Sequence, residues 1–145
     1  MRKMILVLII IFIAFIAIGC STIDEKTLVA IGESNKPTNE YKNITPSDAK
    51  RRLIEEKEII LLDVRTIEEY EVKHIPGSVL IPVEVIDKEA KEKLKDKTAT
   101  IFIYCRSGRR SVTASEILVK QGYTNVFNLG GINNWPYETE TGAAK

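Results

Sequence analysis

The sequence has 145 residues and a mass of 16.3 kDa, which is room for a single domain. Apolar residues make up 44% and charged residues 28%, values that exclude a disordered or collagen-like chain. The 21 Lys and Arg residues balance 20 Asp and Glu residues, so the charge gives no indication of nucleic-acid binding. Two cysteines and one histidine are too few for a multi-bridge disulfide scaffold or a soft-ligand zinc site.

The first twenty residues differ from the rest of the chain. Arg2 and Lys3 precede an almost unbroken apolar run over 4–18, and Gly19 and Cys20 follow it. This run is shorter than the roughly 20 residues that a helix needs to cross a hydrocarbon core. Positive residues, an apolar stretch and a small residue in this order are typical of a secretory signal peptide.

Residues 17–20, Ala-Ile-Gly-Cys, resemble a bacterial lipobox, although Ala17 stands where leucine is usual. The resemblance implies a signal peptide over 1–19 and a lipid on Cys20, which would become the first residue of the mature chain. The protein would then be extracytoplasmic and anchored to the membrane by its lipid. The alternatives are an uncleaved N-terminal transmembrane anchor, with Cys20 as an ordinary thiol, and a cytoplasmic chain.

The segment over 20–42 is polar and shows no sustained helical or alternating apolar pattern. It contains Gly32, Pro37 and several Ser, Thr and Asn residues, a composition typical of a flexible tether. One compact domain is therefore expected over 43–140.

Within this domain, predicted strands alternate with predicted helices. Thr45 as N-cap and Pro46 at the first helical position indicate the start of a helix. Two further helices are expected over 84–95 and 111–121, the second ending at Gly122. Short apolar runs predict strands at 59–64, 79–81, 100–104 and 125–129. This alternation predicts an α/β fold, a small parallel sheet flanked by helices on both faces.

Cys105 directly follows the predicted strand over 100–104. Ligands of open α/β sheets bind beyond the carboxyl ends of the strands, which is where this cysteine is expected. The helix expected to begin at Ser111 would stabilise a nearby thiolate through its exposed N–H groups and its macrodipole. The position therefore favours a reactive thiol.

The residues after Cys105 add positive charge and backbone freedom. Arg106, Arg109 and Arg110 are fixed cations, and Gly108 allows the loop to curl with its amides toward an anion. We therefore expect a nucleophile in an anion-binding cradle. The alternative is an inert buried cysteine at the end of a strand, and the three arginines argue against burial in an apolar core.

The run over 105–111, Cys-Arg-Ser-Gly-Arg-Arg-Ser, resembles the active-site loop of the rhodanese family. Motifs similar to the family's N-terminal and C-terminal signatures lie on either side, at 61–65, 69–70 and 74–78 and at 128–131 with Trp135. The resemblance covers 43–138 in the correct order. Lys73 departs from the pattern, because many members have glycine there.

The resemblance implies a rhodanese-like fold and a sulfurtransferase activity. Cys105 would take the outer sulfur of a small anionic donor such as thiosulfate and become a persulfide, which the loop amides would stabilise. An acceptor, cyanide or a thiol, would then remove the sulfur in a second step. No metal or organic cofactor is required. The substrate-binding residues implied by the loop are Arg106, Ser107, Gly108, Arg109, Arg110 and Ser111.

Other residues of these motifs are expected to support the structure. Asp63 and Arg65 lie at the end of a predicted strand, where a pair that braces the site is expected rather than a proton-transfer role. His74 belongs to a turn in the family pattern. Structural roles are also expected for Trp135 in capping the core, for Gly130 and Gly131 in a tight turn, and for 87–97 as a solvated helix face.

Three other interpretations remain open. A cysteine phosphatase of the tyrosine-phosphatase type needs an arginine at position 111, where this chain has Ser111. A non-catalytic rhodanese-like binding module would not need Cys105, which this chain retains. In an oxidising compartment Cys105 could pair with Cys20, although lipidation of Cys20 would prevent that disulfide.

Overall fold

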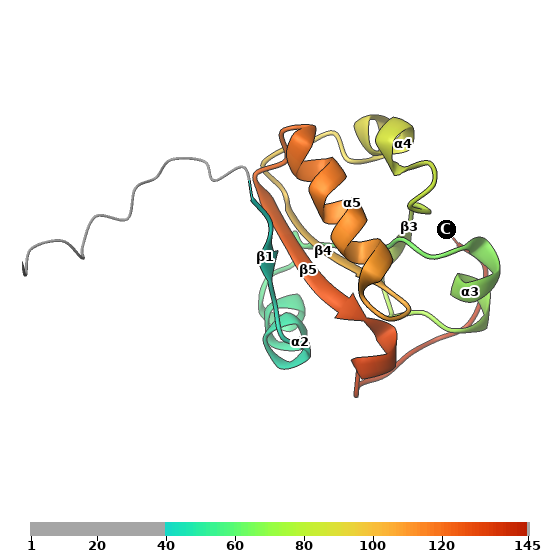
Figure 1. Cartoon of the computed structure of the whole chain (residues 1–145). Helices are drawn as coiled ribbons and strands as arrows, with labels where there is room; N and C mark the ends of the chain where they lie inside the picture. Colours follow the sequence, from blue (N-terminus) through green and yellow to red (C-terminus); the bar gives the residue numbers. More distant parts are fainter. Residues whose placement is uncertain (1–39, 145) are drawn as a thin grey trace, which may run out of the picture. The chain divides into compact units, whose positions relative to one another are not determined.

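The computed structural model describes residues 40–144. The predicted signal peptide, Cys20 and the predicted tether up to residue 39 lie outside the described residues. The strands of this part form one parallel sheet in the order β1-β5-β4-β2-β3 (Figure 1). The strands are β1 (Lys42–Asn43), β2 (Ile60–Asp63), β3 (Val79–Leu80), β4 (Thr100–Cys105) and β5 (Asn125–Gly131).

Helices cover both faces of the sheet (Figure 1). Alternate side chains of β4 point to opposite faces, so Ile103 and Cys105 lie in one apolar cluster and Tyr104 lies in the other. The first cluster is covered by α4 (Ile86–Lys93) and α5 (Arg109–Lys120), and the second by α2 (Pro46–Glu55) and the 3₁₀ helix η1 (Ile132–Asn134). The predicted α/β architecture is confirmed.

The helix ends follow from local chemistry. Thr45 caps α2, accepting a hydrogen bond from the backbone N–H of Asp48 at 3.1 Å. At the C-terminal end of α5, Gly122 has a φ of +91°, and its N–H donates to the carbonyl of Val119 at 2.9 Å, as in a Schellman motif. Both ends agree with the sequence prediction. Helix α4 spans Ile86–Lys93, shorter than the predicted 84–95.

Two boundaries near Cys105 differ from the prediction. Helix α5 begins at Arg109 rather than at Ser111, because Gly108, with a φ of +109°, turns the chain directly into the helix. The predicted tight turn at Gly130 and Gly131 is wrong, because both residues continue β5 alongside β4. The loop at the end of β4 is therefore short and lies against a strand.

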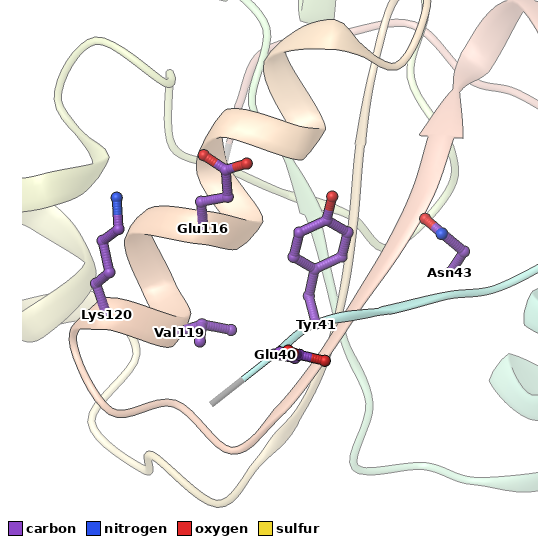
Figure 2. A pocket seen from close by; sticks show the side chains of 6 residues that line it. All are labelled: Glu40, Tyr41, Asn43, Glu116, Val119 and Lys120. Carbon is purple, nitrogen blue, oxygen red and sulfur yellow. The ribbon is translucent and has the colours of Figure 1, made fainter. Parts of the chain in front are cut away.

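The edge of the sheet beside β1 includes part of the predicted tether. Lys42 pairs with Phe127 of β5, and Tyr41 packs against the core, so these residues belong to the folded domain. Among residues 40–144, no helix is both long and apolar enough to cross a membrane. A hollow of about 410 Å³ lies beside the C-terminal half of α5 (Figure 2). It is lined by Glu40, Tyr41, Asn43, Glu116, Val119 and Lys120.

Candidate active site

Cys105 is the last residue of β4, and its side chain is only 1% exposed. The expectation that the arginines would keep it out of an apolar core was wrong, because Arg106 and Arg109 point to solvent while the thiol lies beneath the loop. The backbone N–H of Gly108 donates a hydrogen bond to Cys105 Sγ at 3.1 Å. Within the described residues Cys105 is a free thiol.

The environment of this thiol favours its ionised form. Burial raises the pKa of Cys105, but the backbone amides of Ser111, Gly108 and Ser107 lower it, and the net pKa lies below the ordinary value of a cysteine. These amides belong to the loop and the first turn of α5, where N–H groups have no intrahelical partner. A thiol that is both buried and stabilised as a thiolate is suited to nucleophilic chemistry.

The hydroxyl of Ser111 supports the loop from below. Ser111 is buried, and its Oγ lies 2.8 Å from the carbonyl oxygen of Gly108 and 2.7 Å from Asn128 Oδ1. Asn128 Oδ1 also accepts the N–H of Gly130 at 3.1 Å. Position 111 therefore carries a buried hydroxyl bonded within the domain, and no arginine clamp for a phosphoryl group.

Position 131 requires glycine because there is no room for a side chain, not because of its backbone conformation. Its φ of −115° is available to any residue, but a Cβ there would lie 2.6 Å from the carbonyl oxygen of Arg106 and 2.7 Å from Ser107 Cα. The N–H of Asn133 donates to the same Arg106 carbonyl at 3.2 Å. Gly131 of β5 and Asn133 of η1 thus hold the loop in place through close contact. The sequence prediction missed this role for both residues.

An open cavity of about 730 Å³ lies over the loop. Four of the six predicted substrate-binding residues line it, whereas Gly108 and Ser111 do not and instead support the loop. The lining residues are Glu69, Glu84, Arg106, Ser107, Arg109, Arg110 and Asn133.

Arg110 is held by Glu69 of helix α3 (Ile67–Val72). Its Nη1 and Nη2 donate to the Glu69 carboxylate at 2.6 and 2.8 Å, which raises the pKa of Arg110 and lowers that of Glu69. Glu69 also accepts the N–H of Thr66 at 3.2 Å, which completes a capping box. The spacing of Thr66 and Glu69 was a signal in the sequence that could have located α3 and this contact.

Asp63 and Arg65 form the expected ion pair, which is almost fully buried. Arg65 Nε donates to Asp63 Oδ1 at 2.9 Å, and Arg65 Nη2 donates to the carbonyl of Lys73 at 2.6 Å. Burial lowers the pKa of Arg65, but hydrogen bonding and charge attraction from Asp63 outweigh it, so the pKa is raised overall. The pair braces the chain between β2 and the turn that follows α3.

His74 and Trp135 have structural contacts. His74 Nδ1 lies 2.8 Å from the Tyr70 carbonyl, and His74 Nε2 lies 3.2 Å from Glu140 Oε1. With both ring nitrogens engaged and no place in the lining of the cavity, His74 supports the turn. Trp135 is buried in the cluster beneath η1.

Comparisons with known proteins agree with this fold. Residues 45–138, more than half of the chain, match the rhodanese-like domain, and the chain therefore belongs to the rhodanese family.

Thiosulfate sulfurtransferase PspE of Escherichia coli K12 is 38% identical over 73 residues, which are 50% of this chain and 70% of PspE. The putative sulfur carrier protein YrkF of Bacillus subtilis 168 is 41% identical over 92 residues, 63% of this chain; the match spans about half (49%) of YrkF. Among solved structures, a rhodanese with anions from E. coli has a TM-score of 0.55 and 34% identity. That match covers 58% of this chain and 99% of the other.

Proposed function

We propose that the protein is a sulfurtransferase that moves sulfane sulfur from an anionic donor such as thiosulfate to a thiophilic acceptor through a persulfide on Cys105. Relatives that are named sulfurtransferases support sulfur transfer as the general class of activity. The observation that carries the specific proposal is the Cys105 thiol at the end of β4, in the loop that leads into α5, with the N–H of Gly108 at 3.1 Å and a lowered pKa.

In the first step, the Cys105 thiolate attacks the outer sulfur of thiosulfate. The sulfur–sulfur bond of the donor breaks, sulfite leaves with the electron pair, and a new bond joins Cys105 Sγ to the transferred sulfur. The amides of Ser107, Gly108 and Ser111 stabilise the negative charge of the persulfide. Arg106 and Arg109, exposed in the cavity, attract the anionic donor.

In the second step, a nucleophile attacks the outer sulfur of the persulfide. With cyanide, a carbon–sulfur bond forms, the bond to Cys105 Sγ breaks, and thiocyanate leaves while the thiolate is restored. Electrons balance without any further oxidant or reductant. Since donor and acceptor react in turn at one atom, initial rates should follow ping-pong kinetics.

Steady-state kinetics of two cysteine variants test this function. Cys105→Ser should abolish thiosulfate-dependent thiocyanate formation, because a hydroxyl cannot form the persulfide, and should leave the circular dichroism spectrum unchanged. The matched control is Cys20→Ser, which removes the other cysteine and should keep full activity. Turnover of Cys105→Ser near the wild-type rate would overturn the proposal.

We also propose that Cys20 carries a lipid that anchors the mature protein outside the cytoplasm. This rests on the lipobox-like residues 17–20 and the apolar run before them. Cys20→Ser should release the protein from membranes on fractionation, whereas Cys105→Ser should stay attached. Continued attachment of Cys20→Ser would contradict lipid anchoring and favour an uncleaved transmembrane anchor.

A further inference from the structure

The cavity over the Cys105 loop carries charges of both signs. Glu69 and Arg110 are matched to each other by two hydrogen bonds, at 2.6 and 2.8 Å. Three charged side chains of the lining remain: Arg106, Arg109 and Glu84, all exposed. Within residues 40–144, none of these three side chains makes a hydrogen bond or an ion pair. Two free cations and one free anion therefore line the cavity.

Glu84 lies on a different segment from the arginines. It follows β3, and the buried Ile86 two positions later fixes the chain at the start of α4. Glu84 lines the same cavity as Arg110, and its charge raises the pKa of Arg110, a smaller effect than that of Glu69. Glu84 thus brings a carboxylate from a separate segment into the cavity that the arginine loop also lines.

This arrangement is a poor match for thiosulfate alone. A cavity of about 730 Å³ is in the size range of sites for larger organic ligands, and thiosulfate has only five heavy atoms. A carboxylate near the loop repels a dianion and attracts an ammonium group. A ligand with both an ammonium group and a carboxylate would satisfy Glu84 together with Arg106 or Arg109.

We propose that Glu84 is a specificity residue that selects acceptor thiols carrying an ammonium group, with Arg106 or Arg109 binding the carboxylate of the same molecule. The class of acceptor is an amino-acid thiol, such as cysteine or a small cysteine peptide. This inference rests on the proposed function, because donor and acceptor of a ping-pong enzyme occupy the same cavity in turn.

The transfer step balances without a cofactor. The acceptor thiol loses its proton to solvent, and its thiolate attacks the outer sulfur of the Cys105 persulfide. The bond between that sulfur and Cys105 Sγ breaks, and its electron pair returns to Sγ as the thiolate. The product is the persulfide of the amino-acid thiol.

The test begins with the full chain loaded by thiosulfate, with loading measured as a gain of about 32 Da, one sulfur atom. The transfer rate is then measured with L-cysteine, with cysteamine, which has only the amine, and with 3-mercaptopropionate, which has only the carboxylate. An ammonium group also changes the thiol's own pKa. Each variant is therefore compared with the wild type for the same thiol, which cancels intrinsic reactivity.

Glu84→Gln should slow transfer to cysteine and cysteamine about threefold, the effect of losing one exposed ion pair. Transfer to 3-mercaptopropionate should stay constant or rise. The matched control is Glu116→Gln, which removes an exposed carboxylate of α5 outside the cavity and should change none of the three rates (Figure 2).

Equal changes in Glu84→Gln for all three thiols, or no change, would overturn the role of Glu84 and leave the proposed function intact. Failure of the wild type to gain the sulfur atom from thiosulfate would overturn the proposed function itself, and the assigned acceptor with it.

Discussion

Arginines at the carboxyl edge of the sheet occupy two contrasting environments. Arg65, after β2, is 4% exposed and bonds to Asp63, which is fully buried. Arg106 and Arg109, after the neighbouring strand β4, are exposed, and within the described residues their side chains make no ion pair. The contrast distinguishes an arginine that is paired within the fold from arginines that remain available to bind a ligand.

The largest difference between the two environments should appear in stability. Arg65→Met leaves the Asp63 carboxylate buried without its partner and should lower the free energy of unfolding by about 3–5 kcal/mol. Arg109→Met should change it by less than about 0.5 kcal/mol, because the side chain is exposed. Urea denaturation of both variants measures this. A loss below about 1 kcal/mol for Arg65→Met would show that its pair behaves like a surface contact.

A substitution in β5 should disturb the loop that follows Cys105. Gly131→Ala places a methyl group against the Arg106 carbonyl and Ser107, so the loop must shift. We expect sulfur transfer to fall at least about tenfold and the free energy of unfolding to fall by about 1–3 kcal/mol. Gly77→Ala is the matched control, because its φ of +78° causes strain but no atom lies within 4 Å of the new Cβ. Equal activity in the two variants would contradict the close contact.

The free arginines should act on donor affinity. Arg106→Gln or Arg109→Gln should each raise the KM for thiosulfate about threefold at low salt, and the effect should shrink as salt screens the charges. Arg51→Gln on α2 removes an exposed arginine that pairs with Glu55 and should leave the KM unchanged. An unchanged KM in both loop variants would mean that these side chains point away from the donor.

A smaller effect is expected in the pH at which the Cys105 thiol ionises. Because its pKa is lowered, the thiolate should form as pH rises through a value below the roughly 8.5 of a free cysteine. The rate of alkylation by iodoacetamide, followed by intact mass in the Cys20→Ser background, should show this midpoint. The lowered pKa of Cys105 also contributes to the free energy of unfolding. This contribution is fully present at pH values above the pKa of Cys105 in the unfolded state, and it is lost as the pH falls through its pKa in the folded state. A midpoint at or above 8.5 would contradict stabilisation by the amides.

The fold could be predicted because its signals are local and strong. The apolar runs that became β2, β3, β4 and β5 needed only hydrophobicity, and the helix ends at Thr45 and Gly122 needed only local chemistry. Helix α3 has six residues, too few for an amphipathic period, and the prediction missed it.

The site could be predicted only in part. The position of Cys105 after a strand and before a helix followed from chain order. Its burial, the place of Gly131 against the loop and the contact between Glu69 and Arg110 depend on distant segments packing together. Arginine composition indicated charge around the loop but not which guanidinium another residue would hold.

The most direct test of the central claim is the intact mass of the purified protein before and after incubation with thiosulfate. The account predicts a gain of about 32 Da that cyanide reverses and that Cys105→Ser does not show. No gain in the wild type, or the same gain in Cys105→Ser, would contradict a persulfide on Cys105.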